Sequence, residues 1–215
     1  MDSSINKTEQ IVDTNTFVNT NLNLFSNILN SLDTVSSEAK SFLKEKLSVD
    51  GKINNQLLEK HQHEGHGYAW FETYRIALRE TFNWFKNLKE TEKATKLESG
   101  ILLFSFAEYL SQMRSGIMMS QTEIVRPESL GISSQSFSFC DSPEIAGLIK
   151  LGLSEAVKAE IVESLENGIF PNLGLNDETL EMIQDQFKKF TDEEIVPHAN
   201  EWHLKDDLIP DEVLK

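Results

Sequence analysis

"GYAWFETYRIALRETFNWFKNL", Gly67 to Leu88, is the stretch that decides the fold class. Its apolar residues recur at spacings of three and four, which places one set of them on a single side of a helix. That set is Trp70, Tyr74, Ala77, Leu78, Phe82 and Phe85. The charged residues Glu72, Arg75, Arg79 and Glu80 fall largely elsewhere. The stretch therefore predicts an amphipathic helix with an aromatic-rich core face.

Immediately upstream, "HQHEGHG" gathers three of the chain's five histidines into residues 61–67. In a continuous helix His63 and His66 share a face, but His61 lies roughly 160° from His63 at about 100° per residue. Only two ligands would then meet, and the helical zinc pattern separates its histidines by four residues. We therefore predict no metal site here.

Two glycines in the same cluster need a structural reason. Gly65 and Gly67 each cost a helix about 1 kcal/mol relative to alanine. Either close packing or a break before the aromatic helix would explain them. Both explanations are structural rather than catalytic.

The remaining chain also has the pattern of helices joined by polar breaks. Apolar spacing predicts helices over 5–32, 36–47, 53–88, 93–113 and 154–165, with "VDGK" (49–52) as a turn. Asparagines and threonines between Asp13 and Asn23 weaken the first of these helices. "SSQSFSFCDSP" (133–143) predicts a loop or a short strand-like stretch. No series of alternating strands occurs, so the predicted class is all-α.

A break rich in turn residues, "NGIFPNLGLND" (167–177), predicts a domain boundary. After it, the Asp177 carboxylate is suited to cap a new helix. Leu180, Ile183, Phe187 and Phe190 form that helix's apolar face. Pro197 lies inside the continuing pattern, so the helix must kink there or stop and restart.

Composition excludes several classes of partner and site. Acidic residues outnumber basic ones 35 to 20, giving a net charge of −15, which opposes binding to nucleic acid and to anionic membranes. The single cysteine, Cys140, rules out an internal disulfide framework and is expected to be an inert packed residue. The N-terminus has no secretory signal pattern, and the apolar run 100–110 is too short to span a bilayer. We expect a cytoplasmic protein.

No self-sufficient active site is predicted. The sequence contains no G-x-S-x-G, no G-x-G-x-x-G and no phosphate loop. The acids at 192–194 are typical of a solvated helix surface. Arg126, before Pro127, is expected to tie a loop to an acid such as Glu123. We therefore assign no catalytic, cofactor-binding or metal-binding residue in this chain.

The last forty residues resemble the opening of the acyl-CoA dehydrogenase fold. The elements that carry this resemblance are Phe187 and Phe190, Val196-Pro197, Ala199 with Glu201, and Ile209-Pro210. Upstream, "EGHGYAWFETYRIALRETFNWF" (64–85) and "FAEYLSQMRSGIMMSQTEIVRPESLGI" (106–132) resemble the N-terminal extension of one branch of that family, the (2S)-methylsuccinyl-CoA dehydrogenases. The resemblance covers roughly residues 57–215. It implies a helical N-terminal extension (1–167), a linker (168–176) and the incomplete start of an acyl-CoA dehydrogenase N-terminal domain (177–215).

In that family, a middle β-domain and a C-terminal helical bundle bind FAD and the CoA thioester and supply a catalytic glutamate. No position of this sequence matches those residues, so the resemblance implies FAD for the full-length family but none in this chain. The chain is accordingly expected to be an N-terminal fragment that is not catalytic by itself, from a truncated gene, a split gene or an expressed piece. The alternative is a stand-alone helical interaction module.

The resemblance also bears on partners. Acyl-CoA would be a ligand only of the full-length family. This chain would bind the missing catalytic domains or associate with itself through its C-terminal helix. There, Ile183, Phe187, Phe190 and Trp202 are expected to be at least partly exposed.

Overall fold

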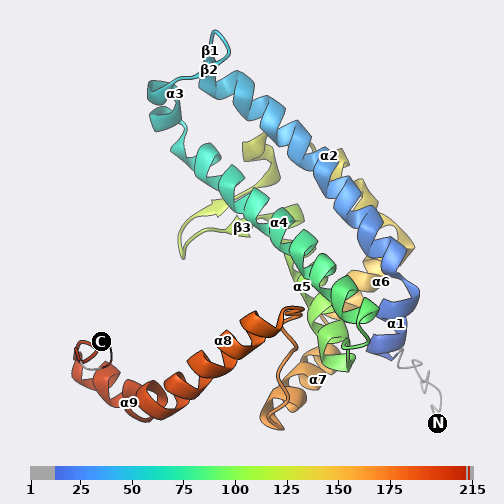
Figure 1. Cartoon of the computed structure of the whole chain (residues 1–215). Coiled ribbons are helices and arrows are strands. Elements are labelled where there is room, and N and C mark those ends of the chain that lie inside the picture. Colours follow the sequence, from blue (N-terminus) through green and yellow to red (C-terminus); the bar gives the residue numbers. More distant parts are fainter. Residues whose placement is uncertain (1–12, 212, 214–215) are drawn as a thin grey trace, which may run out of the picture. The chain divides into compact units, whose positions relative to one another are not determined.

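The computed structural model describes residues 13–211 and 213, and in these residues the chain is mainly helical (Figure 1). The described part contains nine α-helices, short 3-10 and π-helical segments, and two antiparallel strand pairs of two residues per strand. The predicted all-α class is confirmed. The chain divides into two compact units, Met1–Asn172 and Leu173–Lys215, each described below by itself.

The first unit contains seven of the α-helices, both strand pairs and two 3-10 helices. Its helices are α1 (Thr14–Thr20), α2 (Leu22–Leu47), α3 (Asn55–Lys60), α4 (Gln62–Glu90), α5 (Lys96–Ser115), α6 (Pro143–Gly152) and α7 (Glu155–Glu166). Its strands are β1 (Ser48–Val49), β2 (Lys52–Ile53), β3 (Ile117–Met118) and β4 (Ile124–Val125). The 3-10 helices are η1 (Pro127–Leu130) and η2 (Ser134–Asp141).

Helices α2 and α4 form the long antiparallel pair of this unit (Figure 1). The chain reverses between them through the predicted turn at residues 49–52, where β1 pairs with β2. Asp50 and Gly51 both have positive φ, 53° and 75°, as expected when Asp-Gly closes a two-residue hairpin. The predicted turn is confirmed.

The predicted break between residues 32 and 36 is wrong, because α2 runs unbroken from Leu22 to Leu47. Its buried stripe continues through Leu32, Val35 and Ala39. The hydroxyls of Ser31, Thr34, Ser37 and Ser41 donate to carbonyls four residues back, an arrangement that is compatible with a continuous helix. The break lies instead at Asn21, between α1 and α2. Of the helix predicted over 5–32, residues 5–12 lie outside the described part.

A second correction concerns the helix predicted over 53–88. It is divided at His61, which ends α3 and begins α4, so the break precedes the two glycines and α4 runs through them. Close packing is the explanation that holds for Gly67: a Cβ atom there would lie 2.3 Å from Val125 Cγ2 of β4. At Gly65 a Cβ would lie 3.2 Å from Leu58 Cδ1 of α3.

The core is built where α4 and α5 pack with α2. Phe25 of α2 stacks with Phe82 of α4 at a centroid distance of 6.1 Å and meets Phe106 of α5 edge-on at 4.9 Å. The predicted α4 face is confirmed at Leu78, Phe82 and Phe85, but Trp70, Tyr74 and Ala77 are only partly buried, and Phe71 is buried in their place. Edge-to-face aromatic contacts of this kind add to the gain from burial.

The segment predicted as a loop or strand-like stretch, residues 133–143, is the 3-10 helix η2 followed by the first residue of α6. Helix α6 was missed, although Pro143 at its first turn and the Ser142 cap are helix-start signals. Ser154 caps α7, since its hydroxyl accepts from the Val157 N–H. Of the apolar residues of α7, Val157 is buried, Ile161 is partly buried, and Val162 and Leu165 are exposed.

The second unit contains α8 (Glu178–Phe190), the π-helical segment η3 (Thr191–Ile195) and α9 (Val196–Lys205). Asp177 caps α8 by accepting from the Thr179 and Leu180 N–H groups, as predicted. The predicted disturbance at Pro197 is confirmed: the helix changes to π geometry just before the proline, which offers no N–H to the preceding turn. None of the described residues of this unit is buried, and Phe187 is 69% exposed.

None of the helices in the described ranges has the length and apolar character needed to cross a membrane.

Candidate functional site

The histidine cluster, the first candidate for chemistry, has three separate sets of partners. His61 Nδ1 lies 3.3 Å from Glu64 Oε1, which also pairs with Lys46. His63 Nδ1 lies 3.1 Å from Glu123 Oε1, on the connection between β3 and β4. The His66 ring accepts a 3.0 Å hydrogen bond from Trp70 Nε1.

These side chains do not converge on one point. Across residues 13–211 and 213, no group of three or more His, Cys, Asp or Glu could hold a metal ion. The Lys46 ammonium, hydrogen-bonded to Glu64, lowers the pKa of that carboxyl below its usual value, which is the signature of a salt bridge. The cluster therefore ties the start of α4 to α2 and to the β3–β4 connection.

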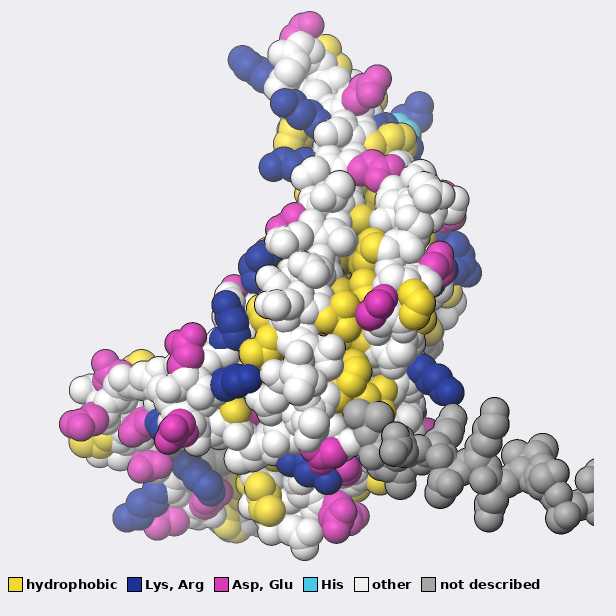
Figure 2. All heavy atoms as spheres, turned by 90° about the vertical axis from the view of Figure 1, so that its right-hand side faces the viewer, with side chains coloured by type: hydrophobic (Ala, Val, Ile, Leu, Met, Phe, Trp, Pro, Cys, Tyr) yellow, Lys and Arg dark blue, Asp and Glu magenta, His cyan; other side chains and the backbone are white. Residues whose placement is uncertain are grey.

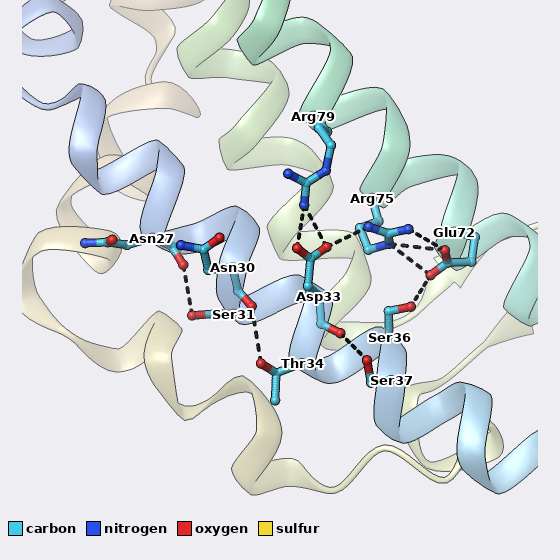
Figure 3. Close-up of polar contacts among 10 residues, drawn as sticks. All are labelled: Asn27, Asn30, Ser31, Asp33, Thr34, Ser36, Ser37, Glu72, Arg75 and Arg79. Carbon is cyan, nitrogen blue, oxygen red and sulfur yellow. Dashed lines mark hydrogen bonds and ion pairs between the residues drawn. The ribbon is translucent and has the colours of Figure 1, made fainter.

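The most elaborate polar group links α2 to α4 (Figure 3). Asp33 of α2 accepts from Arg75 at 2.6 Å and from Arg79 at 2.6 and 2.7 Å. Arg75 also donates to both carboxylate oxygens of Glu72, and the Ser36 hydroxyl donates to Glu72 at 2.5 Å.

Both arginines in this network are already committed to carboxylates. Burial raises the pKa of Glu72, but hydrogen bonds from Arg75 and Ser36 outweigh it and hold the pKa below its usual value. Bidentate arginine–carboxylate contacts of this kind fix geometry. The network therefore sets the register of α2 against α4 and offers no free cation to a substrate.

Glu98 is the buried carboxylate of the described chain, with 2% of its surface exposed. It completes a capping box with Thr95 at the start of α5, and its other oxygen accepts from the Asn172 N–H at 2.9 Å. The Asn172 carbonyl accepts from Trp84 Nε1 at 2.8 Å. Burial raises the pKa of Glu98, but the hydrogen bonds from Thr95 and Asn172 lower it below its usual value.

These contacts hold the backbone of Asn172 through both its N–H and its carbonyl, at the last residue of the first unit. A carboxylate that accepts three hydrogen bonds in this way is a structural anchor and is poorly suited to take up a proton as a general base. The capping box could be read from T-x-x-E (95–98) in the sequence, but the link to Asn172 could not.

Two further residues singled out from the sequence have structural roles. Cys140 is buried, so the predicted packed position is confirmed, and burial raises the pKa of its thiol to about 11, which disfavours the reactive thiolate. Arg126 does not pair with Glu123, which contacts His63 instead. It donates to the Ser115 carbonyl at the end of α5, where a positive charge is favourable.

The described residues do not form the glycine-rich dinucleotide site in which a pyrophosphate binds free backbone N–H groups at a helix N-terminus. In the described chain six helix N-termini are capped by the side chains of Asp13, Asn54, Thr95, Ser142, Ser154 and Asp177. The other three, those of α2, α4 and α9, follow a preceding helix directly.

Comparison with known proteins bears out the resemblance seen in the sequence. The chain is 37% identical over 198 residues, 90% of its length, to (2S)-methylsuccinyl-CoA dehydrogenase from Cereibacter sphaeroides, an acyl-CoA dehydrogenase. It spans 35% of that protein's length, which is consistent with an N-terminal portion. No family model matches the chain.

Proposed function

We propose that this chain is the N-terminal portion of an FAD-dependent acyl-CoA dehydrogenase that oxidises an acyl-CoA thioester of the methylsuccinyl type between its α and β carbons. The observation that carries the proposal is the 37% identity over 90% of the chain to (2S)-methylsuccinyl-CoA dehydrogenase. An alignment of that extent with a much longer enzyme favours a part of such an enzyme over a chance likeness.

We further propose how the chain divides. Residues 1–167 are a helical extension, residues 168–176 a linker, and residues 177–215 the start of the dehydrogenase's N-terminal helical domain. The exposed apolar residues of α8 support this division, because a helix with one apolar face is suited to pack against further helices.

The chain alone is proposed to be non-catalytic, with the flavin and the catalytic base supplied by the remainder of the longer protein, acting in the cytoplasm. The pairing of Arg75 and Arg79 with carboxylates and the side-chain cap of α8 support this, since none of these groups is free to bind a substrate or a cofactor.

The test is to express both the chain 1–215 and the whole reading frame to which it belongs. The longer protein should purify yellow, with a flavin absorbance, and should oxidise (2S)-methylsuccinyl-CoA with an artificial electron acceptor. The 215-residue chain should be colourless and inactive. A frame that continues past Lys215 into unrelated sequence, or a 215-residue chain that binds FAD, would contradict the proposal.

The alternative, a stand-alone helical interaction module, is favoured by one observation. Ile183, Phe187 and Phe190 are exposed along α8 and line an open hollow with Gln186. If this alternative holds, the chain alone should form a defined complex with a helical partner or with itself, and the reading frame should hold no dehydrogenase sequence.

A further inference from the structure

An open pocket of about 390 Å³ lies in the first unit where the end of α2, the β1–β2 hairpin, α3 and the start of α4 meet. Its apolar lining is formed by Leu43, Leu47, Ile53, Leu58 and Tyr68. Small-ligand pockets are typically hollows of about 300–1,000 Å³, mostly apolar with a few polar groups. The pocket is separate from the Asp33 network and from the Glu98 anchor.

Local backbone features keep this pocket open. Asp50 and Gly51 turn the hairpin back on itself with positive φ, so β2 forms one wall. Gly65 lines the pocket without a side chain, opposite Leu58 of α3. Two wall residues are exposed apolar side chains, Ile53 at 71% and Leu58 at 40%. Their exposure is the kind that an apolar ligand would relieve.

Two lysine side chains also line this pocket beside its apolar residues. Lys40 and Lys44, one turn apart on α2, both line the pocket and are exposed. Neither has an ion pair or hydrogen bond to any residue in the described ranges. The nearest acid in sequence, Glu45, lines an adjoining hollow together with Lys44. Because residues next to each other in a helix do not face each other, Glu45 is not placed to pair with Lys44. Figure 2 shows lysine or arginine, acidic and hydrophobic side chains intermixed at the end of the first unit that carries the hairpin.

We propose that this pocket binds a medium-chain carboxylate, a free fatty-acid anion, with its alkyl chain against the apolar wall and its carboxylate beside Lys40 and Lys44. The two ammonium groups that flank the hollow, without a partner among the described residues, favour an anionic ligand. It must be largely alkyl because the lining is apolar. The site uses no residue on which the proposed dehydrogenase function depends.

The test uses octanoate as the probe and the ¹⁵N-labelled 215-residue chain. Titration should give saturable amide shifts confined to residues 40–68, with a Kd of about 1 mM or tighter. Octanoate should bind Lys40→Gln/Lys44→Gln about three- to tenfold more weakly, because each exposed ion pair contributes only modestly. Lys52→Gln is the control for loss of a lysine charge near the hairpin: it removes one positive charge on β2, outside the pocket lining, and should bind as the unaltered chain does.

Two further measurements separate the contributions of the lysines and the apolar wall. Octanol, which has the same alkyl chain without the charge, should bind the unaltered chain and the double lysine variant equally. Ile53→Asp, at an exposed position, should abolish octanoate binding while leaving the circular dichroism spectrum unchanged. Absence of saturable shifts, an equal loss in Lys52→Gln, or unchanged binding in folded Ile53→Asp would each overturn the proposal.

Discussion

Gly67→Ala is the substitution that tests the packing of α4 most directly. A Cβ at this position would lie 2.3 Å from Val125 Cγ2 and 2.8 Å from Val125 Cβ. Rotation of the valine side chain can relieve the first contact but not the second, so the backbone of α4 or β4 must move. Overpacking of this kind costs about 1–3 kcal/mol, while alanine gains about 1 kcal/mol of helix propensity over glycine. We expect a net loss of up to about 2 kcal/mol.

The chain offers a matched control in Gly147 of α6. Apart from the backbone of its own helix, no heavy atom of the described residues lies within 4 Å of the position that a Cβ would take there. Gly147→Ala should therefore show only the propensity gain and raise the free energy of unfolding by up to about 1 kcal/mol. Urea unfolding followed by circular dichroism measures the free energy of unfolding of both variants. A shift of the urea midpoint reports a change in stability when the dependence of that free energy on urea concentration is unchanged.

A double variant decides whether Val125 is the cause. Val125→Ala removes the Cγ atoms that lie 2.3 and 3.2 Å from the added carbon. In Gly67→Ala/Val125→Ala we expect a favourable coupling of about 0.5–2 kcal/mol relative to the sum of the single changes. The reasoning is refuted if Gly67→Ala raises the free energy of unfolding as much as Gly147→Ala does, or if the double variant shows no coupling.

Four further outcomes follow from the contacts described above. Glu98→Gln should cost about 1–3 kcal/mol of unfolding free energy and speed hydrogen exchange at the Asn172 amide; unchanged exchange would refute the anchor. Because the pKa values of Glu72 and Glu98 are lowered in the folded chain, their contribution is present above the ordinary pKa of about 4.5 and lost as pH falls through the folded values. Urea midpoints should therefore drop below about pH 4.5, and a flat profile there would contradict this. If the chain associates with itself through α8, its mass in analytical ultracentrifugation should rise with protein concentration, and Phe187→Ser should abolish that rise. An identical rise in both chains would show that the α8 face does not mediate the association. Cys140 should react with a thiol reagent only on unfolding; rapid reaction in the native chain would contradict its burial.

Local signals in the sequence located most helix ends, because caps act within a few residues. Thr95, Ser154 and Asp177 all cap the helices that follow them. The unbroken α2 could not be foreseen, since its polar residues at 33–37 are held by α4 and by backbone carbonyls rather than by a turn. Helix α6 was not predicted because it has only 10 residues and follows a serine-rich segment that is typical of a loop.

The long-range polar contacts could not be predicted from one sequence. Arg75 was correctly placed off the core face, but its partner Asp33 lies 42 residues away, and Glu98 reaches Asn172 across 74 residues. Nothing in the local pattern around any of these residues specifies such a partner. For the histidines, helical spacing sufficed to argue against a shared metal, but not to identify Glu123 as the partner of His63.

The hydrogen bonds that hold the backbone of Asn172 bear on how the two units fold during translation. The buried hydrophobic residues of the described chain lie between Val18 and Val157, and Glu98 and Trp84 hold the backbone of Asn172, the last residue of the first unit. Once that residue has left the ribosome, the unit has every partner that its core requires. Domains generally fold as units in the order in which they emerge. The first unit can thus form its core before the apolar face of α8 has emerged, which keeps that face from competing for the core.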